Sequence, residues 1–240
     1  MVAVSAPRAS AVLTRWFFGM ALVSWRYMWQ ITPLHREERP GDPVHDAPPP
    51  LQAAQVDDEV QLADEGVGPL YHRRFHVHIP GAAVSADELM RRIVQDFGRF
   101  VPSEVVAVRR SPGADSPLRH GDEFVVEMPG PWNGPVRVVD ATRTCLRLVT
   151  LRGHLEAGQV QFQVRDAGAA LEFEIQAWAR PSTQLVRWLY CVLRLAKEIQ
   201  LNMWVRFCRE VVHDSGGRLC DGVWIKTLQI PENTRVQAVT

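Results

Sequence analysis

The sequence predicts one soluble α+β domain in which a curved antiparallel sheet grips a single long C-terminal helix. Apolar and polar side chains alternate at residues 71–79 and in several segments between residues 123 and 178, as in half-buried strands. Residues 182–213 instead place apolar side chains every three or four positions, which is typical of a long amphipathic helix. Strands in series followed by one helix exclude a four-helix bundle and a parallel α/β sheet.

Composition and charge limit the class of protein. The chain has 240 residues, of which 46% are hydrophobic and 22% charged, an ordinary globular balance with enough apolar side chains for a sizeable core. Its 27 lysines and arginines equal its 27 aspartates and glutamates, so the formal net charge is zero. A nucleic-acid binder usually presents a strongly basic face, and we therefore expect no nucleic-acid partner. The four cysteines form no CxxC pair, which favours a reducing cytoplasm.

Residues 1–32 are predicted to form a separate N-terminal helix rich in large aromatic rings. Its apolar run, residues 16–23, is too short to cross a bilayer, which takes about 20 apolar residues, and no small-residue cleavage site follows. Such a helix can cover an apolar surface of its own domain or bind a partner. Alternatively, residues 11–30 lie in a membrane interface, where tryptophan and arginine side chains are both accommodated. These three alternatives remain open.

Residues 33–69 are predicted to be an extended linker. They contain several prolines, including the run at residues 48–50, together with several acidic residues and few side chains that can pack. The turn-forming sequence GVGPL at residues 66–70 ends this segment.

The main domain is predicted to begin at residue 70 with a strand and a capped helix. Strict alternation from Tyr71 to Ile79 indicates a half-buried strand. Ser85 followed three residues later by Glu88 is the pattern of a capping box, which predicts a helix over residues 86–97.

A series of antiparallel strands is expected in the middle of the chain. The predicted strands cover residues 123–128, 136–139, 144–151, 158–164 and 171–178. The sequence PGPWNGP between the first two is a turn that no helix tolerates. Short turns between consecutive strands indicate a meander.

The long helix and a short tail complete the predicted chain. Pro181 stands where a first helical turn accepts proline, and a glycine pair ends the periodicity of residues 182–213. We expect the domain to span residues 70–217 and residues 218–240 to form a last short strand and a tail. This order of elements is that of a helix-grip fold, in which the space between sheet and helix is either filled or left as a ligand-binding cup.

Several stretches of the sequence also resemble a known family. They are HRRFHVHIP, GDEFVVEMPGPWNGPVRVV, LVTLRGHLEAGQVQFQV, FEIQAWARP and LAKEIQLNMW. Over about residues 65–215 the chain resembles the domain-of-unknown-function family DUF1990, of the START-like (SRPBCC) superfamily of helix-grip proteins. The resemblance implies a fold and a tendency to bind ligands, without implying a reaction. The sequence WARPS departs from the serine-arginine-proline expected there, which weakens any role for a hydroxyl.

Arg73 is the first candidate ligand contact, because the alternation places it on the apolar side of its strand. A buried guanidinium needs a carboxylate or a ligand anion nearby. A structural ion pair with Glu123 or Glu127 is one interpretation, and an anion-binding role in the cup is the other.

His76 and His78 are two residues apart on the opposite face of the same strand, a spacing that can bind a metal. Arg74 shares that face, and its fixed positive charge would repel a cation. We therefore predict no metal site.

His154 and Glu156, in the sequence GHLEAG, are weak candidates for acid–base catalysis. Hydrogen bonds that stabilise a turn explain the same spacing. No nucleophile motif, phosphate-binding loop or dinucleotide fingerprint accompanies the pair, so we expect no cofactor and do not favour an enzyme.

Four further residues are candidates for the rim of the cup. Trp132 and Trp178 offer large rings for an apolar or ring-shaped ligand, although packing explains them equally well. Arg137 and Arg180 flank the same regions and are suited to hold a carboxylate or phosphate headgroup.

These observations favour a non-enzymatic, cytoplasmic protein that binds an apolar or amphiphilic small molecule. Two alternatives remain. One is an enzyme of cyclase or hydrolase type that uses the same cup. The other is an interaction module with a filled cup, in which residues 11–30 bind a partner or contact a membrane peripherally. The sequence leaves the ligand and the oligomeric state open.

Overall fold

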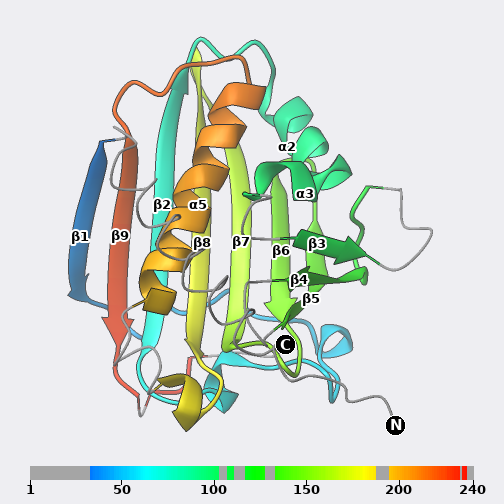
Figure 1. Cartoon of the computed structure of the whole chain (residues 1–240), viewed down its shortest axis with the longest axis vertical. Helices are drawn as coiled ribbons and strands as arrows, with labels where there is room; N and C mark the ends of the chain where they lie inside the picture. The colour runs from blue at the N-terminus through cyan, green and yellow to red at the C-terminus, as the bar shows by residue number, and fades with distance from the viewer. Residues whose placement is uncertain are drawn as a thin grey trace, which may run out of the picture.

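A computed structural model shows a broad sheet with helices on one face (Figure 1). The structure describes residues 33–102, 107–110, 117–127, 133–187, 195–232 and 234–236. The predicted N-terminal helix of residues 1–32 and the candidate Trp132 lie outside the described residues. Within the described ranges, no helix combines the length and the apolar character needed to cross a bilayer.

In the described part of the chain, nine strands form one curved sheet in the order β1-β9-β2-β8-β7-β6-β5-β4-β3. They are β1 (Leu34–Pro40), β2 (Leu70–Pro80), β3 (Ala107–Arg110), β4 (Glu123–Glu127), β5 (Asn133–Ala141), β6 (Cys145–Thr150), β7 (Glu156–Ala167), β8 (Ala170–Pro181) and β9 (Val223–Ile230). The run from β3 to β8 is the predicted antiparallel meander, with β3 as an additional strand.

The sheet is mixed, which corrects the expectation of a purely antiparallel one. Strands β1 and β9 run parallel, from Leu34 opposite Val223 to Pro40 opposite Gln229. Parallel neighbours cannot be joined by a tight hairpin and need a long connection. Here almost the whole described chain separates the two strands, so blue β1 and red β9 lie side by side in Figure 1.

One face of the sheet, here called the inner face, carries the helices α2 (Ala86–Gln95), α3 (Phe97–Phe100) and α5 (Leu195–Asp214). The alternation predicted for β2 is confirmed, since Phe75, Val77 and Ile79 are fully buried in the core on this face. The opposite, outer face carries His72, Arg74 and His76.

A cluster of aromatic rings fills the space between α5 and the upper part of the inner face. Phe207 of α5 lies at its centre, with ring centroids 5.1 Å from Phe162 and 5.4 Å from Phe97. Phe173 stacks on the same ring at 5.9 Å. Rings at these separations and tilted angles add directional attraction to the burial of apolar area. This half of the predicted cup is therefore packed by the protein's own side chains.

The predicted helix of residues 182–213 is described only in part. Residues 184–187 form a helical turn, α5 runs from Leu195 to Asp214, and residues 188–194 lie outside the described set. The glycine pair does follow the helix, and Gly216 takes a positive φ of 73°, as expected of a glycine after a helix.

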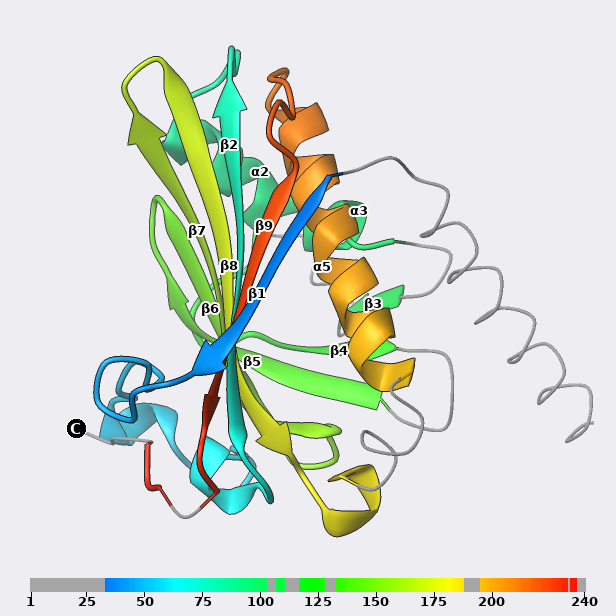
Figure 2. The same ribbon diagram turned by 90° about the vertical axis from the view of Figure 1, so that its left-hand side faces the viewer.

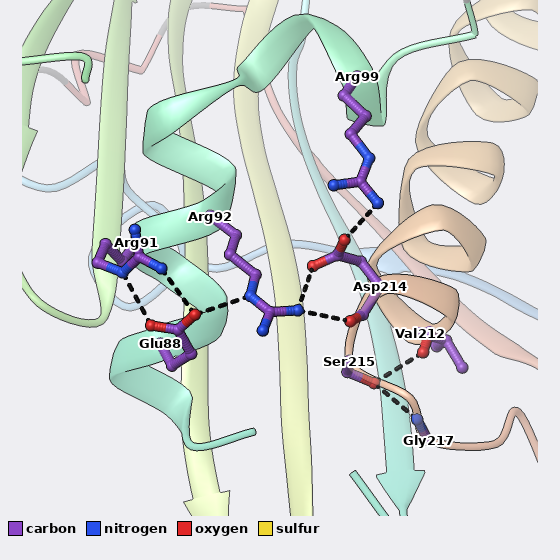
Figure 3. Close-up of polar contacts among 8 residues, drawn as sticks. All are labelled: Glu88, Arg91, Arg92, Arg99, Val212, Asp214, Ser215 and Gly217. Atoms are coloured by element: carbon purple, nitrogen blue, oxygen red, sulfur yellow. Dashed lines mark hydrogen bonds and ion pairs between the residues drawn. The ribbon is translucent and has the colours of Figure 1, made fainter. Parts of the chain in front are cut away.

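A polar network joins α2 and α3 to the end of α5 (Figure 3). The Asp214 carboxylate, whose side chain is only 5% exposed, lies 2.6 Å from Arg99 and 3.4 Å from Arg92. Ser85 caps α2 as predicted by accepting a hydrogen bond from the Glu88 backbone. The Glu88 carboxylate, however, accepts hydrogen bonds from Arg91 and Arg92 in place of the return bond of a capping box.

The segment of residues 33–69 is packed against the sheet, which corrects its prediction as a linker. After β1 it forms two short 3-10 turns, and Leu51 and Val60 are almost completely buried against the outer face beside Val149. Figure 2 shows this segment over the lower part of the outer face. A few apolar side chains suffice because β5 and β6 present apolar residues on that face as well.

The sheet also extends beyond the boundary expected at residue 217. Strand β9 lies between β1 and β2, and it pairs with β2 from Trp224 opposite His76 to Ile230 opposite Leu70. Both ends of the described chain therefore belong to the same sheet as the predicted main domain.

Candidate functional site

Arg73 forms a buried polar cluster on the inner face, with Glu156 of β7 and Gln200 of α5. Its side chain is 4% exposed, and its Nη1 donates a hydrogen bond to Gln200 Oε1. The same Nη1 lies 3.8 Å from Glu156 Oε1, and Gln200 Nε2 donates to Glu156 Oε2 at 2.7 Å. Three elements distant in the sequence thus supply one connected network inside an otherwise apolar face.

The strands position these residues through their register. Arg73 pairs with Ala177 of β8, and Glu156 pairs with Pro181, so both side chains point to the inner face on either side of β8. The expected partners of Arg73 were wrong. Glu123 instead binds Arg137, and Glu127 lies 2.5 Å from Arg109.

The guanidinium of Arg73 is not fully satisfied. Its Nε is buried and has no hydrogen-bond partner among the described residues. The Nε1 atom of Trp204, one helical turn along α5 from Gln200, is likewise buried and without a partner there. Buried donors without acceptors cost free energy, and their presence in a native structure calls for an explanation such as a ligand or ordered water.

The inner face around this cluster carries small side chains. Along β8 the inward residues change from Phe173 and Ile175 to Ala177 and Ala179. On β7, Gly158 lies opposite Ala179. At these three positions the sheet therefore presents side chains of minimal size, whereas large rings fill the upper part of the inner face.

A groove of about 540 Å³ opens beside the cluster. Its lining includes Tyr71 and Thr227, the neighbours of Arg73 along β2 and across to β9. The Arg73 guanidinium also lies 5.1 Å from the centre of the Tyr71 ring. Solvent thus reaches the inner face immediately next to the buried cluster.

His154 lies near this cluster but is not directed at the Glu156 carboxylate. Its Nδ1 accepts a hydrogen bond from the Glu156 backbone nitrogen at 2.9 Å. Desolvation lowers the pKa of His154, so the neutral imidazole is favoured. The ring closes the turn before β7, which is the stabilising role that the sequence left open.

Arg137, Trp178 and Arg180 lie on the outer face and are not brought together with Arg73. Arg137 binds Glu123 and Asp57, each at 2.8 Å from one of its nitrogens. Trp178 stacks on His72 with ring centroids 4.7 Å apart.

Arg180 holds the C-terminal segment. It donates hydrogen bonds to the backbone oxygens of Glu232 at 2.8 Å and Thr234 at 2.5 Å. Desolvation lowers the pKa of Arg180, and Asp64 and Glu232 partly offset this effect. Its described contacts are thus structural.

A comparison with protein families matches residues 58–212, more than half of the chain, to a domain of unknown function, DUF1990. The chain belongs to the DUF1990 family. Among curated proteins, no sequence matches it.

Solved structures resemble this DUF1990 chain in part. A hypothetical protein of Helicobacter pylori has a TM-score of 0.43 and 13% identity, covering 59% of this chain and 87% of its own. A Thermobifida fusca protein has a TM-score of 0.43 and 17% identity, covering 60% and 93%. The di-domain ARO/CYC StfQ from the steffimycin biosynthetic pathway has a TM-score of 0.42 and 10% identity, covering 62% and 51%. These likenesses concern the fold alone.

The histidines of β2 in this DUF1990 chain do not converge on a common point. His72 binds Gln176 Oε1 at 3.0 Å, and His76 lies 3.9 Å from Glu172. Within the described ranges, no group of three or more His, Cys, Asp or Glu side chains could hold a metal ion.

Sequence reasoning missed Gln200. One signal for it existed, because Gln200 precedes the buried Trp204 by four residues and so lies on the same face of α5. A polar residue in the buried row of a helix is a sign of a partner in the core. Its partners, Arg73 and Glu156, are distant in the sequence and could not be identified by spacing.

Proposed function

We propose that this DUF1990 chain binds an amphiphilic small molecule on the inner face of its sheet, with the polar end of the molecule at Arg73. The observation that carries the proposal is the buried Arg73 guanidinium, whose Nε lacks a partner among the described residues. An acceptor atom supplied by a ligand would satisfy this donor and recover the free energy lost by desolvation.

The charge of the cluster limits the polar end of the ligand. Glu156 already lies 3.8 Å from Arg73, so the positive charge is partly neutralised before any ligand binds. A carbonyl, carboxyl or hydroxyl group fits such a site better than a group with several negative charges, which Glu156 would repel.

The apolar part of the ligand has a matching surface. Ala177, Ala179 and Gly158 give β8 and β7 small side chains at three inner-face positions beside Arg73, and the groove at Tyr71 gives access to them. Ligand sites of this kind combine a mostly apolar lining with a few polar groups that fix orientation.

Native mass spectrometry of the purified full chain, followed by solvent extraction, tests the proposal. We expect a reproducible amphiphilic compound that the wild type retains and the Arg73→Met variant loses. Arg74→Met is a matched control, because the adjacent arginine points to the outer face and should leave the bound compound unchanged. If both variants retain the compound equally, Arg73 does not hold it and the proposal fails.

The ring cluster around Phe207 supports a second candidate, an interaction module with a filled interior. In that case the extraction yields no compound, and lipids or aromatic compounds do not raise the melting temperature. Deleting residues 1–32 would then abolish association with a partner or a membrane while the remaining chain stays folded.

A further inference from the structure

A second groove, of about 600 Å³, lies on the outer face of the sheet, across β1, β9, β2 and β8. Its lining includes His35, Arg74, His76, Glu174, Trp224 and Lys226. In Figure 2 the segment of residues 41–66 covers only the lower part of this face, and no described element lies over the upper part. This groove shares no lining residue with the inner-face groove.

A row of flat rings crosses the groove. The strand register places Trp224 of β9 opposite His35 of β1 on one side and opposite His76 of β2 on the other. His35 stacks on the indole with ring centroids 4.0 Å apart and an interplanar angle of 16°. Trp224 is nevertheless 51% exposed, although it is among the largest apolar side chains. An exposed indole held in a fixed orientation is a surface on which a planar ligand can stack.

A row of cations lies next to the rings. Lys226 follows Trp224 by two residues on the same face of β9, and it pairs directly with Arg74 of β2. Like charges opposite each other on neighbouring strands repel and destabilise the pair. Arg74 is compensated by Glu174, whose oxygen lies 2.6 Å from Arg74 Nη2. Lys226 has no ion-pair partner in the described part of the chain.

In the described residues, neither carboxylate that lines the groove forms an ion pair with Lys226. Glu174 is bound by Arg74 and Gln176. Glu37 lies opposite Lys226 on β1, and its carboxylate forms an ion pair with Arg39. An incoming anion would therefore relieve the repulsion between Lys226 and Arg74 and would meet carboxylates that already have cationic partners. A phosphate suits two adjacent cations, because its several oxygens can accept from both.

We propose that this outer groove binds a phosphorylated compound with a flat ring, the ring stacking on Trp224 and the phosphate lying between Lys226 and Arg74. Residues two apart on one face of a strand are separated by about 7 Å. That spacing accommodates a ring and a phosphate joined by a short linker, as in a nucleoside monophosphate. The ligand is small, and the zero net charge of the whole chain does not conflict with it.

Isothermal titration calorimetry on the full chain with adenosine monophosphate, adenosine and inorganic phosphate as probes tests the proposal. We expect the monophosphate to bind at least about tenfold more tightly than adenosine or inorganic phosphate, since only the monophosphate contacts both the Trp224 ring and the two cations. Lys226→Gln and Trp224→Ala should each weaken the binding of the monophosphate by about tenfold or more. Both side chains line an open groove, and circular dichroism should show that both variants remain folded.

Arg165→Gln is the matched control for loss of a positive charge, because Arg165 is exposed on the outer face but lies outside the groove. It should bind the monophosphate like the wild type. The proposal is overturned if adenosine binds as tightly as the monophosphate, if the monophosphate does not bind at about 10 mM, or if Arg165→Gln weakens binding as much as Lys226→Gln. The Arg73→Met variant should bind the monophosphate normally, which separates this groove from the inner-face site.

Discussion

Arg73 of β2 and Glu156 of β7 approach to 3.8 Å although strand β8 runs between their two strands. Two strands that are not neighbours can be bridged in this way only by long side chains that pass over small ones. The intervening inner-face residues of β8 are Ala177 and Ala179. The ion pair and the small side chains beneath it are therefore one structural feature, and the interpretation of the inner face depends on it.

Glu156→Gln should lower the free energy of unfolding by about 1–3 kcal/mol, because it leaves the buried Arg73 guanidinium without a compensating charge. Arg73→Met in the same chain should recover part of that loss, since it removes the uncompensated charge. Urea denaturation of both single variants and the double variant measures the coupling between them. Strictly additive losses would show that the two side chains do not interact.

Stability should fall in mildly acidic solution because of His72. Desolvation lowers the pKa of His72 below its ordinary value of 6.5, so the unfolded chain binds a proton at a higher pH than the folded chain. The contribution of neutral His72 to the free energy of unfolding is fully present above about pH 6.5, and it declines as the pH falls toward the lowered pKa of His72 in the folded chain.

His72→Gln should make the fall in melting temperature between about pH 7.5 and about pH 5 shallower. Some dependence remains in the variant, because desolvation lowers the pKa of His154 in the same direction. An unchanged slope in His72→Gln would contradict the assignment to His72.

Asp214→Asn should lower the free energy of unfolding by about 1–3 kcal/mol. The buried carboxylate forms ion pairs with both Arg92 and Arg99, and these pairs join α5 to α2 and α3. Asp87→Asn is the control, because Asp87 pairs with Arg143 at the exposed surface and such pairs contribute about 1 kcal/mol or less. Chemical denaturation measures the free energy of unfolding of both variants, and the loss should be larger for Asp214→Asn. Equal losses would place Asp214 among ordinary surface pairs.

Gly158→Ala should destabilise the fold by roughly 2–4 kcal/mol, because an added Cβ would overlap the carbonyl oxygen of Trp178 on β8. Gly168→Ala is the comparison. It lies in the turn after β7 with a φ of 67° and open space around it, so only the backbone conformation opposes the substitution, at about 1–2 kcal/mol. Melting curves of the two variants should therefore differ clearly, and a smaller loss for Gly158→Ala would contradict the close approach of β7 to β8.

Sequence patterns correctly predicted those features of the fold that depend on residues close together in the sequence. Alternation in residues 71–79 gave the faces of β2, including the inward direction of Arg73, because successive side chains on a strand point to opposite faces. Ser85 marked the start of α2, because a hydroxyl at that position caps a free backbone nitrogen. In contrast, β3 and the packing of residues 33–69 were missed, since a short strand and a chain of isolated apolar residues give no period to detect.

Sequence spacing likewise did not predict the contacts of several candidate site residues. Their spacing of two residues suggested that His154 and Glu156 act as a pair. The His154 ring instead accepts a hydrogen bond from the Glu156 backbone nitrogen, and the Glu156 carboxylate accepts one from Gln200. Arg137 and Arg180 were placed near the cup because their neighbours in the sequence were. Each turned out to face outward, because its strand presents alternate residues to opposite sides of the sheet.

The sequence by itself determined the order of the strands β2 and β4 to β8, the inner and outer faces of β2, and the presence of an arginine among apolar side chains. Only the tertiary structure decided that β1 and β9 pair in parallel, that Glu156 and Gln200 are the partners of Arg73, and that Lys226 lies opposite Arg74. The physical reason is range. Periodicity and capping act over a few residues, whereas strand register and side-chain pairing join residues that are far apart in the sequence and depend on the packing of the whole sheet.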